Sequence, residues 1–140
     1  MDNKPKFITF LKVLDNAAKA KRISDAANHY FLKNIPVLIT VPNDQAAQYI
    51  DQLLWRLPDS SFLPHQLTEA PSKELVVITT AQNNVNQAKT LINLCPTAAQ
   101  SPDQFTTIIE LLDHTSTEKL QLSQQRQAAY QSLGYTIQER

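Results

Sequence analysis

The stretch VLITVPNDQAAQYIDQLLWRLP, residues 37–58, holds a strand pattern that leads directly into a helix pattern. Its first five residues, VLITV, are apolar or β-branched, which is typical of a strand buried on both faces of a parallel sheet. Asn43 or Asp44 can cap the helix that follows, and Pro58 marks its end. Apolar residues recur along this helix at helical spacing and are expected to face the sheet: Ala46, Ile50, Leu53, Leu54 and Leu57. A buried strand followed by an amphipathic helix is the repeating unit of α/β folds.

Strand and helix patterns alternate through the rest of the chain. Runs rich in β-branched and aromatic residues predict strands at 6–13, 75–80, 89–94 and 106–112, although the last can also form a short helix. Helices are expected from Asp15 or Asn16 to about Lys33 and from about Ser116 to Leu133. Gly134 should follow the final helix in the left-handed backbone conformation, with a terminal strand or tail at 135–137. We therefore predict one α/β domain over residues 1–140, with a mostly parallel sheet flanked by helices on both faces.

The charge and glycine content argue against two classes of protein. The 13 basic and 13 acidic residues cancel, so that the formal net charge is zero. Such a chain has no broad positive field that would steer it onto nucleic acid. Gly134 is the only glycine, whereas the loops that bind phosphate in the common nucleotide-binding enzymes need several. An enzyme of that kind is therefore disfavoured.

Other features of the composition indicate where the protein works. No apolar run approaches the ~20 residues that span a bilayer. The first residues show no signal-peptide pattern. Cys95 is the only cysteine, so no internal disulfide can form. We expect a cytoplasmic protein that does not contact membranes.

Candidate catalytic residues are few. The chain has three histidines: His29, His65 and His114. None shares a short metal-ligand spacing with another His, Cys or Asp. Asp113 directly precedes His114, but adjacent residues cannot easily orient each other, and Ser116 is better explained as a helix cap than as a nucleophile. Cys95 has no cationic sequence neighbour that would activate it, and Glu110 shows no pairing suited to acid–base work. We predict no catalytic site, no metal and no cofactor.

The cluster KAKR at Lys19–Arg22 has two interpretations. It is either the solvated face of a helix or a small patch that contacts phosphate groups. Two alternative functions stay open. One is a degenerate nucleotide-binding α/β enzyme, which would need an anion site built without glycines, and the other is a direct binder of single-stranded nucleic acid that uses Lys19, Lys21 and Arg22.

The last helix carries a further pattern. Four residues spaced four, three and four apart lie on one stripe: Lys119, Ser123, Arg126 and Tyr130. A neighbouring apolar stripe is expected to face the sheet: Leu122, Ala129 and Leu133. With Tyr135 and Ile137 on its flank, the cationic and aromatic stripe suits a short peptide with an acidic head and an apolar anchor. An ordinary amphipathic helix is the alternative.

Two motifs carry a resemblance to a known family. The run LLWRLPDSSFLPHQL, residues 53–67, has a tryptophan at a helix end, then a proline, a short polar turn and a Phe-aliphatic-Pro-His sequence. The run RQAAYQSLGY, residues 126–135, has the spacing Arg-x-x-Ala-Tyr-x-x-x-Gly-aromatic. Both resemble the chi subunit of bacterial DNA polymerase III holoenzyme. The order of the expected elements also agrees over nearly all of the chain.

The resemblance implies a fold, a function and two sites. The fold would be reminiscent of nucleotide-binding domains without their phosphate loop. The function would be that of a non-catalytic clamp-loader adaptor that joins the psi subunit to the acidic C-terminal tail of single-stranded DNA-binding protein, and so contacts nucleic acid only indirectly. The implied psi-binding residues are Trp55, Phe62, Leu63, Pro64 and His65. The tail-binding residues would be Lys119, Ser123, Arg126, Tyr130, Tyr135 and Ile137. Several cationic positions of the family's tail site are replaced in this chain, by Leu120, Gln124, Gln127 and Gln131. The tail is therefore expected to bind more weakly, in a rearranged pocket, or elsewhere on the molecule.

Overall fold

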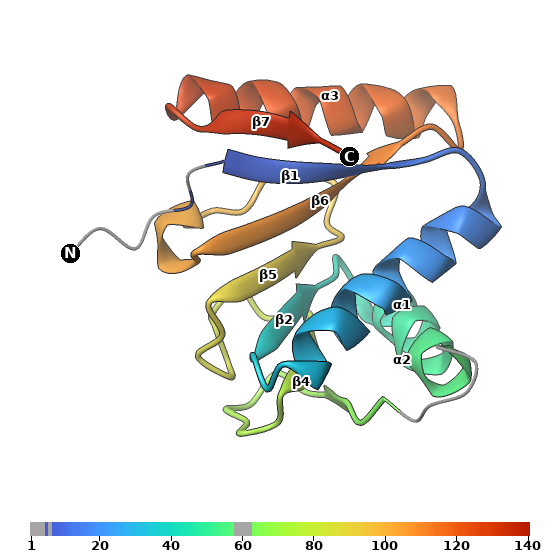
Figure 1. Ribbon diagram of the computed structural model, residues 1–140, viewed down its shortest axis with the longest axis vertical. Helices are drawn as coiled ribbons and strands as arrows, with labels where there is room; N and C mark the ends of the chain where they lie inside the picture. Colours follow the sequence, from blue (N-terminus) through green and yellow to red (C-terminus); the bar gives the residue numbers. More distant parts are fainter. Residues whose placement is uncertain (1–4, 6, 58–62) are drawn as a thin grey trace.

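A seven-stranded sheet forms the centre of the computed structural model, which describes residue 5 and residues 7–57 and 63–140. The strands are β1 (Phe7–Val13), β2 (Val37–Thr40), β3 (Gln66–Leu67), β4 (Val76–Thr79), β5 (Thr90–Asn93), β6 (Thr107–Asp113) and β7 (Thr136–Glu139). Their order across the sheet is β3-β4-β2-β5-β6-β1-β7, and every pairing between described strands is parallel (Figure 1). This confirms the predicted α/β class and the mostly parallel sheet.

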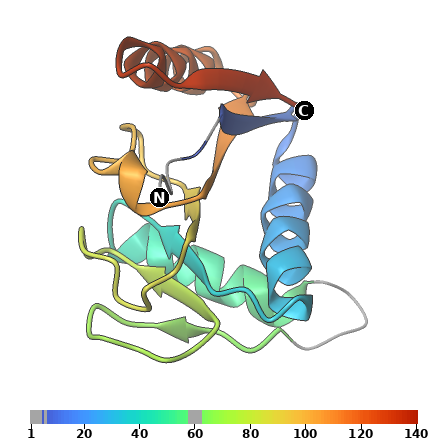
Figure 2. The same cartoon turned by 60° about the vertical axis from the view of Figure 1, so that its left-hand side comes forward.

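Three α-helices cover the two faces of this sheet. They are α1 (Asn16–Leu32), α2 (Asp44–Arg56) and α3 (Thr117–Ser132), and a short 3-10 helix, η1, spans Pro102–Gln104. Helices α1 and α2 pack on one face and α3 on the other (Figures 1 and 2). Among the described helices, none is long and apolar enough to cross a bilayer.

Local signals in the sequence explain where the helices begin and end. The side chain of Asp15 accepts a hydrogen bond from Ala18 N at 2.7 Å, and that of Asn43 accepts one from Ala46 N at 2.9 Å. Ser116 caps α3 in the same way. These caps satisfy backbone amides that have no partner within the helix. Gly134 follows α3 with a φ of 95°, which confirms the expected left-handed turn.

The apolar core is divided between the two faces of the sheet. Strand β6 shows how this happens, because successive side chains of a strand point to opposite faces. Ile109 and Leu111 pack in the cluster beneath α1 and α2, whereas Ile108 and Leu112 pack in the cluster that includes Tyr130 of α3. Ile50, Leu53 and Leu54 of α2 are buried as the apolar stripe predicted.

The predicted facing of α3 is wrong. Leu122 and Leu133 are 38% and 63% exposed, and Ala129 also lies at the surface. The side chains that face the sheet are instead Ser123, Arg126 and Tyr130. The reason lies in the opposing strand, where Glu110 occupies the α3 face of β6 with no exposed surface. A buried carboxylate needs a cation and hydrogen-bond donors, so α3 turns its polar stripe inward.

Three further differences are small. The segment after Pro64 was expected to be a loop, but Gln66 and Leu67 pair with β4 as the two-residue strand β3. In α2 the more deeply buried alanine is Ala47 rather than Ala46. The predicted start of the first strand at residue 6, the expected helix end at Pro58 and the candidate Phe62 lie outside the described residues.

The connections create an opening at one edge of the sheet. Strands β1 and β6 are neighbours, but β1 leads into α1 on one face and β6 leads into α3 on the other. In open parallel sheets, ligands bind outside the carboxyl ends of the strands at such a point, where the chain leaves toward opposite faces. Any small-molecule or peptide site of this fold is therefore expected at that edge.

Candidate functional site

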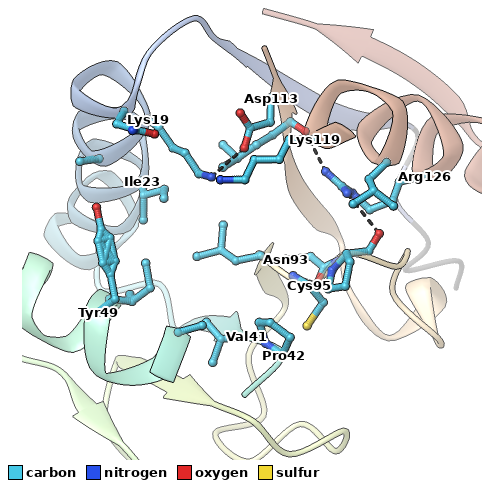
Figure 3. A pocket seen from close by; sticks show the side chains of 18 residues that line it. Lys19, Ile23, Val41, Pro42, Tyr49, Asn93, Cys95, Asp113, Lys119 and Arg126 are labelled. Atoms are coloured by element: carbon cyan, nitrogen blue, oxygen red, sulfur yellow. Dashed lines mark hydrogen bonds and ion pairs between the residues drawn. The ribbon is translucent and has the colours of Figure 1, made fainter. Parts of the chain in front are cut away.

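A pocket of about 640 Å³ lies at this edge, and we refer to it as the switch-point pocket. Side chains from α1, α2 and α3 and from the ends of β2, β5 and β6 surround it (Figure 3). Its walls are largely apolar, with contributions from Ile23, Val41, Ile50, Leu111 and Leu122. Its volume falls within the range of ordinary ligand sites, roughly 300–1,000 Å³.

The charged groups of the pocket leave one cation unpaired. Lys19 Nζ lies 2.7 Å from Asp113 Oδ2, and Thr115 also donates to this carboxylate through its amide and its hydroxyl. Burial alone would raise the pKa of Asp113, but the hydrogen bonds from Lys19 and Thr115 outweigh it and lower the pKa below its ordinary value. Lys119 is exposed and forms no ion pair within the part of the chain that the structure describes. Its ammonium gives the pocket a local positive charge.

Arg126 reaches the pocket but is held by a buried network. Its Nε donates to Glu110 Oε1 at 2.9 Å, and its Nη2 donates to Leu111 O at 3.0 Å and to Ser123 Oγ at 3.2 Å. A further bond runs from Nη1 to Pro96 O at 3.2 Å. The guanidinium therefore has one N–H left to offer a ligand, and its main contribution is to neutralise Glu110.

Glu110 accepts two more hydrogen bonds within the same network. The Tyr130 hydroxyl donates to its Oε2 at 2.5 Å and Asn93 Nδ2 donates to the same atom at 2.7 Å. Burial raises the pKa of Glu110 to about 7, although Arg126 and the hydrogen bonds oppose the shift. Burial and the neighbouring Glu110 charge raise the pKa of Tyr130 as well. Ala99 N donates to the Tyr130 oxygen, so this hydroxyl is fully used within the protein.

The helix N-termini around the pocket are already capped. The amides of Ala18, Ala46 and Lys119 donate to the caps Asp15, Asn43 and Ser116. Phosphate-binding loops instead direct several free amides at the ligand. The geometry thus agrees with the absence of a glycine-rich phosphate loop in the sequence. No group of three or more His, Cys, Asp or Glu side chains suited to a metal ion occurs within the described residues.

A second surface lies at the other end of α2. We refer to Trp55, Leu63, Pro64 and His65 as the Trp55 patch. Trp55 is 56% exposed, and its ring centroid lies 4.8 Å from that of His65. The His65 side chain is buried, with Nδ1 2.7 Å from Leu63 O and Nε2 3.0 Å from Asp51 Oδ1. Leu63 is also fully buried. The exposed indole therefore rests on a rigid base.

The residues predicted to bind a peptide tail are only partly brought together. Lys119 and Arg126 line the switch-point pocket. Tyr135 lies elsewhere: it packs edge-on against the Tyr130 ring and its hydroxyl bonds to Asp103. Ile137 is half-buried in β7, where it pairs with Ile8 of β1. The predicted residues therefore do not form one continuous surface.

The basic cluster of α1 is divided in the same way. Lys19 belongs to the pocket, Lys21 pairs with Asp25 at 2.6 Å in solvent, and Arg22 donates to the backbone oxygen of Arg140 at 3.1 Å. Neither a purely solvated face nor a phosphate patch describes it well. The roles of Glu110 and Asn93 in the buried network were not predicted from the sequence. A charged residue inside the apolar run TTIIELL was the available signal.

Comparison with known proteins identifies the family. The family model described as "DNA polymerase III chi subunit, HolC" matches residues 6–138. The chain belongs to the chi subunit family of DNA polymerase III. A chi family relative, DNA polymerase III subunit chi of Escherichia coli (strain K12), is 27% identical over 104 residues, covering 72% of this chain and 70% of the relative. The predicted resemblance is thereby confirmed, and chi family membership makes the chain a replication accessory subunit of DNA polymerase III.

The fold occurs outside the chi family too. The C-terminal domain of S. cerevisiae Dbp5, solved bound to Gle1 and IP6, superposes with a TM-score of 0.59, covering 95% of this chain and 90% of that one. Only 10% of the residues are identical, so the similarity concerns the fold alone.

Proposed function

We propose that this chi family member is an adaptor that links the psi subunit to the acidic C-terminal tail of single-stranded DNA-binding protein. The observation that carries the proposal is the presence of two different surfaces at opposite ends of α2. The switch-point pocket includes Ala46 near the start of this helix, and the Trp55 patch lies at its end. About 14 Å of helix axis separates Ala46 from Trp55. Two partners can therefore bind without competing for the same residues.

The Trp55 patch is the proposed psi surface, together with Phe62. Large exposed aromatic side chains on a rigid base are frequent energetic centres of protein interfaces. Trp55 is the contact in this proposal. Leu63 and His65 act by holding the indole, because their own side chains are buried.

The proposed tail site is the exposed part of α3 near Lys119. The ammonium of Lys119 supplies the charge that an acidic tail requires. Ser123, Arg126 and Tyr130 support the helix from inside, since all three are buried against β6. Tyr135 and Ile137 follow the other end of the helix and are not continuous with this surface, so in this proposal they would contact a separate part of the tail. Simultaneous binding of psi and the tail raises the effective concentration of each near the other, so that modest individual affinities are sufficient.

A bridging experiment tests the adaptor. Psi from the same organism is immobilised, and single-stranded DNA-binding protein is added with and without this chain. We expect retention only when the chain is present. Trp55→Ala should reduce psi binding at least tenfold, and Lys119→Glu should reduce tail binding with psi binding unchanged.

Two surface variants serve as matched controls. Leu133→Ala removes a large exposed apolar residue directly after the end of α3, and Lys89→Glu reverses an exposed charge outside the switch-point pocket. Both should bridge normally. If the unmodified chain retains no single-stranded DNA-binding protein on psi, the adaptor proposal is wrong.

A further inference from the structure

The side chain of His65 lies where neither of its neutral forms satisfies the neighbouring atoms. It has no exposed surface, and its Nδ1 lies 2.7 Å from Leu63 O, whereas its Nε2 lies 3.0 Å from Asp51 Oδ1 and 3.2 Å from Asp51 O. All three of these oxygens accept hydrogen bonds. A neutral imidazole has one N–H and one lone pair, so either neutral tautomer would direct a lone pair at an oxygen. The imidazolium has two N–H groups and donates on both sides.

These two contacts connect α2 with the segment that precedes β3. Asp51 lies in α2 one turn before Trp55, and Leu63 is fully buried in the apolar cluster beneath α1 and α2. The centroids of the Trp55 and His65 rings are 4.8 Å apart, with an angle of 59° between the ring planes. A cation within about 6 Å of an indole is attracted to the ring. A positively charged His65 therefore holds both the buried Leu63 and the exposed Trp55 in place.

Asp51 supplies the negative charge that a buried imidazolium requires. Among the described residues it is the one charged group within ion-pair distance of His65. Strands β3 and β4 pack on α2 and carry no titratable side chain. Basic residues of α2 and α1 have other contacts: Arg56 with Gln52 O, Lys19 with Asp113, Lys21 with Asp25, and Arg22 with Arg140 O. Because histidine ordinarily changes its charge between pH 5 and 8, a contact that needs both N–H groups is sensitive to pH.

We propose that His65, as an imidazolium paired with Asp51, is the positioning residue of the Trp55 patch, and that release of its proton loosens Leu63 and Trp55 and weakens partner binding there. Where the partner is psi, the inference rests on the proposed function, whereas the contacts of His65 within the free chain do not. A partner that prefers the protonated form must in turn favour protonation. Binding at the patch therefore takes up a proton wherever the free chain has lost it.

Intrinsic fluorescence reports on the patch directly, because Trp55 is the only tryptophan of the chain. We expect its emission to change in one step as the pH of the free chain is raised from about 5 to about 9, and His65→Gln to abolish this step. His29→Gln removes a histidine whose ring lies against Tyr30 rather than Trp55, and it should leave the step unchanged. Emission that does not change with pH, or a step that persists in His65→Gln, would overturn the proposal.

Asp51→Asn tests the ion pair while keeping the His65 ring, and it serves as the second variant if His65→Gln does not fold. Loss of the carboxylate removes the group that stabilises the imidazolium, so the fluorescence step should move to lower pH by about one unit. Asp44→Asn removes a carboxylate at the exposed start of the same helix and should leave the step in place. Thermal melts establish that the variants fold, and a step that does not move in folded Asp51→Asn would contradict the pairing.

Nitrogen-15 NMR spectra of the histidine side chains identify the protonated form. Below the fluorescence step both ring nitrogens of His65 should carry a proton, and above the step only one of them should. The rings of His29 and His114 serve as references in the same spectra. A His65 ring that carries a single N–H on both sides of the step would refute the role of the imidazolium.

The affinity for immobilised psi connects the protonation of His65 with binding. The unmodified chain should bind psi at least threefold more weakly above the step than below it, whereas His65→Gln should bind weakly at both pH values. Equal pH dependence of the two affinities would overturn the positioning role. If Trp55→Ala binds psi as tightly as the unmodified chain, the proposed psi surface is wrong, and the fluorescence and NMR results on the free chain still decide whether His65 positions Trp55.

Discussion

Helices α2 and α3 lie on opposite faces of one sheet and are held there by different contacts. Helix α2 buries an apolar stripe that includes Ile50, Leu53 and Leu54. Helix α3 buries Ser123, Arg126 and Tyr130 against Glu110 and leaves Leu122 and Leu133 in solvent. The difference shows that an apolar stripe determines how a helix faces a sheet only where the sheet beneath it is apolar. One buried carboxylate in the facing strand is enough to reverse the preference.

The largest loss of stability is expected from a substitution of Arg126 in α3. Arg126→Leu removes the cation that neutralises Glu110, and the loss of an ion pair partner from a buried site costs about 3–5 kcal/mol in the free energy of unfolding. Urea denaturation at pH 8 measures this loss. Gln124→Leu, on the exposed side of the same helix, should change stability by less than about 0.5 kcal/mol. A loss under about 1 kcal/mol for Arg126→Leu would mean that the pair does not position α3.

The corresponding change in α2 is Leu54→Ala. Leu54 is fully buried, and truncation at such a site costs about 2–5 kcal/mol through lost apolar contact and the cavity left behind. Denaturation curves at pH 5 and pH 8 should give the same loss, because no titrating group is involved. A loss that depended on pH would contradict the purely apolar attachment of α2.

Measuring the free energy of unfolding over a range of pH tests the buried polar contact that holds α3. Burial raises the pKa of Glu110 from 4.5 to about 7. Between these values the folded protein keeps a proton that the unfolded chain has released, so this group lowers the free energy of unfolding as the pH rises. The resulting loss in the free energy of unfolding is at most about 3 kcal/mol, and it is complete once the pH lies above the pKa of Glu110 in the folded protein. Glu110→Gln should reduce the difference in stability between pH 5 and pH 8. If the variant and the unmodified chain show the same pH dependence, Glu110 does not titrate in this range.

The smallest expected effect concerns the exposed side of α3. Leu122→Ala should change the free energy of unfolding by less than about 0.5 kcal/mol, since this side chain does not enter the core. Leu53→Ala in α2 is the matched comparison and should cost several times more. Differential scanning calorimetry of the two variants measures both. Equal losses in the free energy of unfolding would mean that Leu122 packs in the core after all, as the apolar stripe of α3 predicted.

Local signals in the sequence predicted most of the fold. Apolar strand runs, the caps Asp15, Asn43 and Ser116, and Gly134 at the end of α3 act through the nearest backbone groups, so the sequence alone reveals them. The facing of α3 depends on Glu110, which is 16 residues from Arg126 in the chain. The spacing of residues within α3 does not predict the contact between Arg126 and Glu110. The two-residue β3 also has no pattern of its own, because it forms only by pairing with β4.

The candidate sites were less accessible to sequence reasoning for the same reason. The resemblance directed attention to Trp55, and the structure leaves this residue largely exposed. The switch-point pocket is assembled from Asn16, Tyr49 and Lys119 on three helices. These residues are far apart in sequence and share no motif. Only the topology of the sheet brings them to one edge.

The position of β1 in the sheet has a consequence for synthesis. This strand is made first, yet its two neighbours, β6 and β7, both follow residue 106. Its pairing therefore has to wait until most of the polypeptide has left the ribosome, and contacts that span so much chain slow the search for the native arrangement. Until then the apolar side chains of β1 are available to chaperones or to other nascent chains. Slow closure of this strand is the expected last step of folding.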